Sequence, residues 1–444
     1  MRSTLIIRAA ASLALIASAT MALAADPVTT IIIKNARIFD GKSDKLLDGQ
    51  TVIVSGNKIE KIGQNLTPPE GATVIDAGGR VLTPGFIDAH VHLSLVLPPA
   101  KILATDPGYV YAEAVKGAER MLMRGFTTCR DMNGPVFGLK QAIDEGIIPG
   151  PRIYPSGAAI SQTSGHGDFR SPTEPNKNFG GSASASELRG YSFLADGKPQ
   201  VLAAVRENLR RGATQIKVMA GGGVSSVYDP LDVDQFTAEE LKAAVDAAED
   251  WGTYVSVHLY NARGIRRALE AGVKSIEHGH LIDDPTMKLL ADKQAFLSTQ
   301  VYTFTQELPD LNEAQKKRIV EAREGTDLMM RLAKMYKVKI AWGTDLISDL
   351  KYQEHQNLEF TSRLKWFTPV EILKQVTSTN AKLVALSGKR NPYPGKLGVI
   401  EEGAYADLVL VDGNPLENLK LLEDPDKNLV LIMKDGKVVK NTLK

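Results

Sequence analysis

The feature that most constrains the fold is a regular alternation of strand-like and helix-like segments between residues 86 and 345. Short apolar runs rich in β-branched and aromatic residues predict buried strands, and helical patterns fit between most of them. Eight β/α units in about 260 residues favour a closed parallel barrel over an open sheet. We therefore predict an α/β fold in which residues 83–391 form a TIM (β/α)8 barrel. The eight candidate strands are Phe86–His92, Thr127–Asp131, Arg152–Ser156, Thr214–Met219, Thr253–His258, Ser275–His278, Phe296–Gln300 and Lys339–Asp345.

Two of the predicted helices have ends that the sequence marks. Thr237 and Glu240 match a capping box at the start of a helix over residues 238–250. Gly272 follows the periodic run of residues 262–271 and predicts its end, because glycine readily adopts the left-handed backbone that closes many helices. One further segment, residues 160–193, is long, rich in glycine and serine, and without clear periodicity. It follows the third strand, so we expect a loop that covers the substrate.

The two ends of the chain share a different pattern. Residues 25–82 and 392–444 contain short apolar runs separated by glycine turns, with Asp435-Gly436 as a hairpin signal. Neither piece is large enough to bury a core alone. We expect the two to combine into one small β-sandwich beside the barrel.

Residues 1–24 have the features of a secretory signal peptide. Arg2 and Arg8 give a basic start, an apolar stretch follows over residues 9–17, and Ala22-Leu23-Ala24 matches a small-x-small cleavage site. A permanent membrane anchor is disfavoured, because the apolar stretch is interrupted by serines and falls short of roughly 20 residues. We expect cleavage near Ala24, export to the periplasm or the medium, and no membrane attachment afterwards.

The overall charge is balanced, which limits the class of partner. With 53 basic and 52 acidic residues the formal net charge is +1, so the chain has no global attraction to nucleic acid. A small-molecule or dipeptide substrate is the expected partner. The single cysteine, Cys129, allows no internal disulfide, and its place in an apolar strand predicts a buried packing role.

The histidines are concentrated where a barrel carries its active site. Four of the seven histidines, His90, His92, His258 and His278, fall at or near the C-terminal ends of predicted strands. The active sites of TIM barrels lie at that end. His90 and His92 are two apart on one strand, so their imidazoles share a face and can bind one metal ion.

Lys217 and Asp345 complete this group of polar residues. Lys217 lies within an apolar strand, where an ammonium group is costly to bury unless it is paired or chemically changed. Asp345 ends the last strand directly after Gly343-Thr344 and suits a metal ligand or a general base.

The segments around these residues resemble the metal-dependent amidohydrolase superfamily. The resemblance is to its branch of prolidase-type dipeptidases and carboxypeptidases, which also contains ochratoxin-hydrolysing amidases. It extends from about residue 30 to the C-terminus. The branch commonly has a threonine where this chain has Gly221, which leaves the loop shape and the specificity open. The resembling segments are Pro84-Gly85-Phe86-Ile87-Asp88-Ala89-His90-Val91-His92, Ile216-Lys217-Val218-Met219-Ala220-Gly221-Gly222-Gly223, Ile276-Glu277-His278-Gly279 and Trp342-Gly343-Thr344-Asp345.

The resemblance implies a site for two divalent metal ions, with zinc as the first choice and manganese or cobalt as alternatives. Two ions about 3.5 to 4 Å apart can lower the pKa of a shared water and polarise the scissile carbonyl. Asp345 would then be the catalytic base. The branch also implies a homo-oligomer, with an octamer as one form. The resemblance also implies that Lys217 is carboxylated, because carbon dioxide can add to a deprotonated, desolvated lysine amine and the resulting carbamate has two oxygens that can each bind a cation. The implied ligands are His90, His92 and Asp345 for one ion, His258 and His278 for the other, and carboxylated Lys217 as the bridge between them.

Two residues are candidates for substrate binding. His166 lies between glycines in the loop of residues 160–193, where the backbone can approach a ligand closely. Tyr228 follows the turn Gly221-Gly222-Gly223, and in the resembling dipeptidases a tyrosine of this loop contacts the substrate's terminal carboxylate. The alternative for each is a packing role within its loop. His280 and His355 are expected to be structural and surface residues.

These inferences predict a binuclear metal-dependent hydrolase. It would cleave the amide bond to a C-terminal amino acid in dipeptides or N-acyl amino acids, including ochratoxin-type amides, by attack of a hydroxide that bridges the metals. Hydrolysis of a cyclic amide, lactone or carbamate by the same site is the nearest alternative. A Schiff-base aldolase that uses Lys217 is a more distant one, and it leaves the four histidines at the strand ends unexplained. A non-catalytic binding protein would ordinarily have lost one or more of the six ligands.

Overall fold

The computed structural model describes residues 29–226, 228–306 and 311–443. The predicted signal peptide, residues 1–24, lies outside the described residues. Within them, no helix is both long enough and apolar enough to cross a membrane.

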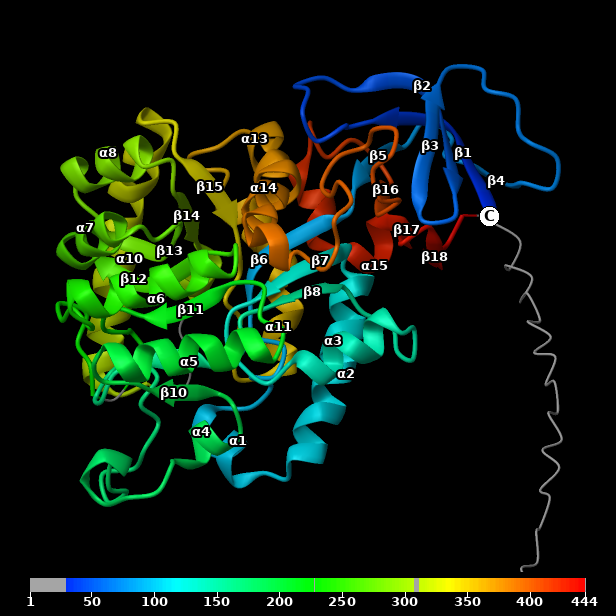
Figure 1. Cartoon of the computed structure of the whole chain (residues 1–444). Coiled ribbons are helices and arrows are strands. Elements are labelled where there is room, and N and C mark those ends of the chain that lie inside the picture. The colour runs from blue at the N-terminus through cyan, green and yellow to red at the C-terminus, as the bar shows by residue number, and fades with distance from the viewer. Residues whose placement is uncertain (1–28, 227, 307–310, 444) are drawn as a thin grey trace, which may run out of the picture.

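The two ends of the chain form one sheet beside the barrel (Figure 1). Its strand order is β18-β17-β16-β5-β1-β2-β3, and β4 pairs with β1. The ends join where β16 runs antiparallel to β5, with Leu410 opposite Leu82. All eight strands belong to one hydrogen-bonded sheet, so the two separate sheets of the predicted sandwich are not confirmed. The strands are β1 (Thr30–Ile38), β2 (Leu47–Ser55), β3 (Lys58–Gly63), β4 (Thr73–Asp76), β5 (Val81–Pro84), β16 (Leu408–Val411), β17 (Leu429–Lys434) and β18 (Lys437–Asn441).

Each of the eight strands predicted for the barrel is present, and neighbouring strands run parallel. Together with β9 and β10, which the sequence did not predict, they form a three-stranded ladder, β6-β7-β8, and a seven-stranded ladder, β10-β9-β11-β12-β13-β14-β15. The α/β class is confirmed, and the ladders have the arrangement of a TIM-like barrel. These strands are β6 (Phe86–Val91), β7 (Phe126–Asp131), β8 (Arg152–Pro155), β9 (Ala159–Ser161), β10 (Ser192–Leu194), β11 (Ile216–Met219), β12 (Val255–Asn261), β13 (Ser275–Leu281), β14 (Phe296–Thr299) and β15 (Lys339–Trp342).

Two backbone hydrogen bonds connect the ladders into a ring. The Thr214 N–H donates to the Pro155 carbonyl at 2.8 Å, and the Asp345 N–H donates to the His90 carbonyl at 2.8 Å. The second bond matters for the site, because it fixes the segment that follows the last barrel strand, β15, against the end of the first, β6.

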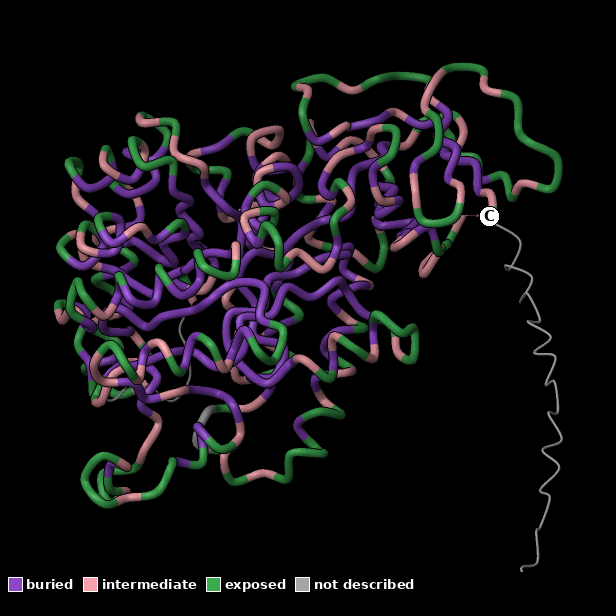
Figure 2. Tube along the Cα trace, viewed as in Figure 1, coloured by how far each residue is buried: buried purple, intermediate pink, exposed green. Residues whose placement is uncertain are grey.

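The helices lie around this ring and cover its apolar outer surface (Figures 1 and 2). Thr237 and Glu240 form the predicted capping box of α6, and Gly272 ends α7 with a φ of 107°. Cys129 is fully buried in the main apolar core, as expected. The helices are α1 (Pro99–Ala104), α2 (Pro107–Met123), α3 (Phe137–Asp144), α4 (Ala185–Leu188), α5 (Lys198–Arg210), α6 (Ala238–Asp250), α7 (Ala262–Ala271), α8 (Asp284–Asp292), α9 (Tyr302–Thr305), α10 (Glu313–Met335), α11 (Leu350–Gln353), α12 (Leu358–Ser362), α13 (Pro369–Lys374), α14 (Asn380–Val384) and α15 (Pro425–Asn428).

Residues 160–193 are more regular than the sequence indicated. The segment contains most of β9, the short helix α4 and the start of β10. Ser184 and Glu187 close a capping box on α4, and the Lys177 ammonium donates to the Leu194 carbonyl at 2.8 Å. These local polar contacts order a segment whose composition gives no apolar periodicity.

Candidate metal centre

His90, His92 and Asp345 converge at the C-terminal end of the barrel strands. Nε2 of His92 lies 2.9 Å from Oδ1 of Asp345, and Nε2 of His90 lies 3.5 Å from the same oxygen. One potential ligand atom of each residue lies within 4.8 Å of the others. Two imidazole nitrogens and a carboxylate oxygen are a donor set that suits a divalent transition metal.

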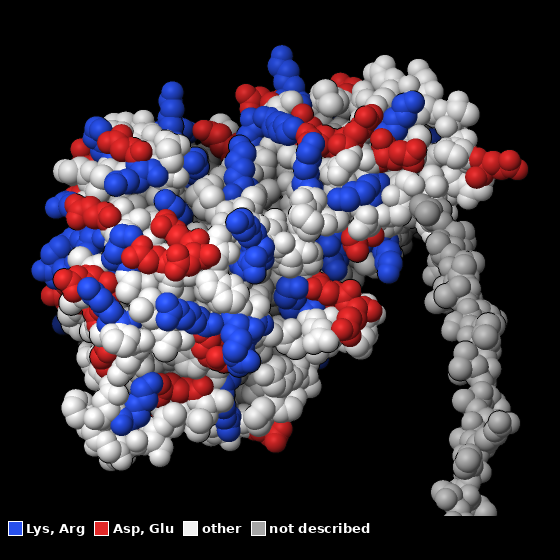
Figure 3. Space-filling model, viewed as in Figure 1, with Lys and Arg blue, Asp and Glu red and all other residues white. Residues whose placement is uncertain are grey.

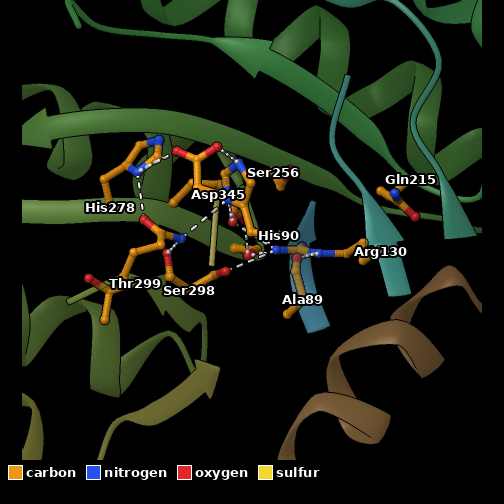
Figure 4. Close-up of polar contacts among 12 residues, drawn as sticks. Ala89, His90, Arg130, Gln215, Ser256, His278, Ser298, Thr299 and Asp345 are labelled. Atoms are coloured by element: carbon orange, nitrogen blue, oxygen red, sulfur yellow. Dashed lines mark hydrogen bonds and ion pairs between the residues drawn. The ribbon is translucent and has the colours of Figure 1, made fainter. Parts of the chain in front are cut away.

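His258 and His278 extend this cluster from β12 and β13. Their ring centroids are 4.5 Å apart, and the His278 ring lies 5.2 Å from that of His90. Nδ1 of His278 is 3.9 Å from Oδ2 of Asp345. Figure 4 shows His278, Asp345 and His90 pointing toward one another across the barrel mouth. The five non-lysine ligands implied by the resemblance therefore lie in one contiguous group.

Lys217 on β11 faces the same group and is only 1% exposed. Burial lowers the pKa of His90, His258 and His278, and the charge of Lys217 acts in the same direction on all three. Among the described residues its ammonium has no hydrogen-bond or ion-pair partner. Burial lowers the pKa of Lys217 to about 8, although the carboxylates of Glu277 and Asp345 act in the opposite direction. A neutral amine is therefore accessible near neutral pH, as carbamate formation requires.

The imidazoles are neutral and oriented by polar contacts on their outer nitrogens. Nδ1 of His90 lies 2.9 Å from Glu277, Nδ1 of His278 lies 2.8 Å from Gln300, and Nε2 of His258 lies 3.1 Å from the Gly222 carbonyl. Each contact leaves the second ring nitrogen free for a ligand, the arrangement typical of metal-binding histidines. Burial lowers the pKa of His278 to about 3 and holds the pKa of His90 and of His258 well below the usual value.

Asp345 is ionised, although burial by itself would raise its pKa. His90 and His92 outweigh burial and lower the pKa of its carboxyl group.

Asp345 and His278 both have left-handed backbones, with φ of 53° and 71°. Such conformations are costly for residues other than glycine and are concentrated at functional sites. The donor types, the outer contacts and the partnerless Lys217 fit the two metal ions that the resemblance implies.

Three residues of this site were missed by the sequence reasoning. Asp88 accepts hydrogen bonds from the His90 N–H at 3.0 Å and from the Thr344 hydroxyl at 2.7 Å, so it joins the two strand ends that carry ligands. Glu277 and Gln300 orient His90 and His278. Asp88 and Glu277 both lie inside the resembling segments, and Gln300 is the last residue of the predicted strand Phe296–Gln300, so each had a usable signal.

Of the two substrate-binding candidates, His166 contacts a candidate metal ligand, whereas Tyr228 is exposed. The His166 ring stacks on that of His258, with centroids 4.0 Å apart and an interplanar angle of 13°, and its Nδ1 lies 3.3 Å from Asp229. His166 thus reaches the site. The Tyr228 hydroxyl donates to the Arg170 carbonyl at 2.9 Å, and the residue is 42% exposed. Its contact joins the loop after β11 to residues 160–193.

The remaining two histidines lie near the mouth. His280 is buried, with its Nε2 3.0 Å from the Gln300 carbonyl and its ring 4.0 Å from that of Phe304. His355 is exposed, and its ring lies 5.8 Å from the rings of Tyr302 and Tyr352.

Gly223 leaves the space that the His166 ring occupies. A Cβ atom at residue 223 would lie 2.0 Å from both Cε1 and Nδ1 of His166. We expect Gly223→Ala to displace this ring and to lower kcat/KM by roughly tenfold or more, equivalent to about 1.4 kcal/mol. Steady-state kinetics together with elemental analysis would check this, because metal content should not change.

Gly138→Ala is the matched control, since a Cβ atom there meets nothing within 4 Å. It should leave kcat/KM unchanged. Parent activity in a folded Gly223→Ala variant would show that the position of His166 does not matter.

A parallel barrel with clustered histidines and an aspartate at its C-terminal mouth is typical of metal-dependent hydrolases. The model of the amidohydrolase family matches residues 81–439, and the chain belongs to this family. It is therefore a hydrolytic enzyme that acts on amide C–N bonds.

Named relatives agree with this assignment. The ochratoxinase of Aspergillus niger is 34% identical over 380 residues, which cover 81% of this chain and 76% of the relative. The crystal structure of a prolidase complexed with N-methylphosphonate-L-proline is 33% identical and covers 93% of this chain and all of its own, with a TM-score of 0.86. A Xaa-Pro dipeptidase with bound methionine is 29% identical and covers 93% of this chain and all of its own, with a TM-score of 0.81.

Proposed function

We propose that the enzyme cleaves the amide bond between an acyl group and a C-terminal amino acid, in dipeptides or N-acyl amino acids. The convergence of His90, His92 and Asp345 at the barrel mouth carries the proposal. The relatives support this substrate class, because their names and ligands describe a prolidase, a Xaa-Pro dipeptidase and an ochratoxinase.

The proposed metal site contains two divalent ions, with zinc as the first choice. His90, His92 and Asp345 would hold one ion, His258 and His278 the other, and carboxylated Lys217 would bridge them. The bound metals would supply Lewis-acid polarisation of the scissile carbonyl and a water of lowered pKa. The lysine amine forms an N–C bond to carbon dioxide and releases one proton, which gives the bridging carbamate.

Asp345 is suited to move the proton. Its side chain is 19% exposed and more accessible than that of His90 or His92, although it contacts both. Hydrolysis forms a bond from the water oxygen to the carbonyl carbon and breaks the C–N bond. We assign to Asp345 the transfer of a proton from the attacking water to the leaving amine.

His166 and Tyr228 are proposed as the substrate contacts. Nδ1 of His166 faces the Asp229 carboxylate, which can only accept, so Nε2 of the neutral ring would carry the lone pair and accept a hydrogen bond from a substrate N–H. Tyr228 belongs to the loop that follows β11, is exposed, and is proposed to reach the terminal carboxylate of the substrate.

A matched pair of substrates tests the proposal. We expect kcat/KM for an N-acyl amino acid to exceed that for its methyl ester by roughly 100-fold, because the ester removes the charge that the site would recognise. Peptide-bond cleavage is measured by chromatography on protein of known metal content. Chelation should abolish the activity, and zinc, manganese or cobalt should restore it.

The alternatives predict different outcomes. Faster turnover of lactones, cyclic amides or carbamates than of any linear amide would favour the nearest alternative. A Schiff-base aldolase would be trapped on Lys217 by borohydride in the presence of a ketone substrate, whereas a carboxylated lysine would not.

We also propose that the protein is exported after cleavage near Ala24 and forms a homo-oligomer. The composition of residues 1–24 supports export. Figure 3 shows basic and acidic side chains interspersed over the visible face, which favours a small-molecule partner over nucleic acid. Mass spectrometry of the mature N-terminus and light scattering test these proposals.

A further inference from the structure

A buried ion pair lies inside the barrel, directly beneath His90. Arg130 extends from β7 and Glu277 from β13, and both side chains are fully buried. Nη2 of Arg130 lies 2.8 Å from each carboxylate oxygen of Glu277. Figure 4 shows the Arg130 side chain extending toward His90, Ala89 and Ser298.

The pair is surrounded by polar partners from other barrel strands. Arg130 donates to the Ser298 hydroxyl at 3.1 Å and to the Tyr254 hydroxyl at 3.3 Å, and its Nε donates to the Ala89 carbonyl. The Ser275 hydroxyl donates to Oε1 of Glu277 at 2.6 Å. Burying two charges is unfavourable unless such partners satisfy them, so this network keeps Glu277 ionised and stationary.

Oε2 of Glu277 faces Nδ1 of His90 at 2.9 Å. An ionised carboxylate can only accept, so Nδ1 must carry the proton and Nε2 must carry the lone pair. The amide nitrogen of Gln300 lies 3.4 Å from the same Nδ1 and would require the opposite tautomer. The shorter, charge-assisted contact decides in favour of Glu277. Gln300 instead offers its oxygen to Nδ1 of His278 at 2.8 Å.

We propose that Glu277, fixed by Arg130, is a positioning residue that sets the tautomer and ring orientation of His90 and directs Nε2 toward Asp345 and the metal. The inference rests on the proposed metal site and extends it to a pair that makes no contact with substrate. Outer partners of this kind commonly change metal affinity 10- to 100-fold when removed. Arg130 acts one step further away, because it holds the carboxylate that holds the imidazole.

The test is metal affinity measured by zinc titration against a competing chelator. Glu277→Gln alone leaves the Arg130 charge unpaired and risks misfolding. The double variant Arg130→Met/Glu277→Met removes both charges, because apolar side chains often replace a buried ion pair without loss of stability. We expect this variant to fold, as judged by circular dichroism, and to bind zinc roughly 10- to 100-fold more weakly than the parent.

Ser275→Ala is the matched control. It removes the hydrogen bond that Ser275 donates to Oε1 of Glu277 and the one that it accepts from Nη1 of Arg130, but leaves the ion pair and the contact of Oε2 with His90 intact. It should lower the melting temperature without changing the affinity for zinc. If the ion pair had a purely structural role, the double variant would likewise show a lower melting temperature and an unchanged affinity for zinc.

The outcomes separate this inference from the proposed function. Parent zinc affinity in the folded double variant overturns the positioning role, whatever the substrate. A parent enzyme that binds zinc but cleaves no acyl amino acid overturns the proposed substrate class, and a weakened double variant still supports the inference. A parent that binds no divalent metal overturns both.

Discussion

Asp345→Asn is expected to reduce turnover by at least roughly 1,000-fold, equivalent to about 4 kcal/mol in the activation barrier. The asparagine has nearly the same shape, so the backbone bond from residue 345 to the His90 carbonyl should persist. The amide cannot take a proton from water, and removal of a general base costs roughly 100- to 10,000-fold. It is also a weaker metal ligand. Steady-state kinetics, with circular dichroism to verify folding, measure the effect.

The control for this variant is Asp412→Asn, which changes an aspartate that pairs with Arg80 at the surface. It should keep parent kinetics. Elemental analysis separates the two roles of Asp345: retained metal with lost turnover indicates the base, and lost metal indicates mainly a ligand. Parent turnover in Asp345→Asn would refute its assignment to either role.

Lys217→Ala should have an effect of similar size, because the proposed bridge would lose both of its oxygens. We expect a fall in kcat/KM of roughly 1,000-fold or more, about 4 kcal/mol. The missing side chain leaves space beside the histidines, so a small carboxylic acid such as acetate should restore part of the activity. Rescue is measured as the rate against acetate concentration, with Lys339→Ala on β15 as the unresponsive control.

Labelling provides an independent test of the carbamate. Metal-free parent protein reconstituted with zinc should need bicarbonate for full activity. With 13C-bicarbonate it should show a protein-bound carbamate carbon that Lys217→Ala lacks. Full reconstitution in carbonate-free buffer would rule out a carboxylated lysine. Lys217 would then be an unmodified buried amine with a different role.

Most of the barrel could be predicted from the sequence, because its evidence is local. A buried parallel strand is a short apolar run, and each of the eight runs contains an observed strand. The helix ends at Thr237 and Gly272 follow from capping chemistry, which acts within a few residues. Residues 160–193 are mainly loop, as predicted, but their short elements were not visible, since polar contacts such as that of Lys177 with Leu194 leave no periodic signal.

The candidate ligands were also visible, because residues at the ends of parallel barrel strands meet at one mouth whatever the helices between them do. The residues that orient those ligands by hydrogen bonds could not be identified as such from the sequence. Glu277 reaches His90 from a strand 187 residues away in the sequence, and Gln300 reaches His278 across a strand pair. No spacing rule connects such residues.

By itself the sequence determined the β/α alternation, the placement of histidines and Asp345 at or near strand ends, and the position of Lys217 within a strand, because periodicity and strand position are properties of short segments. Only the tertiary structure decided that the two chain ends share one sheet through β5 and β16, and that Arg130 and Glu277 lie beneath His90. Closure of the strands into a barrel brings these residues together. The tautomer of each imidazole depends on the hydrogen-bond partner that this closure places against the ring nitrogen that faces away from the metal site.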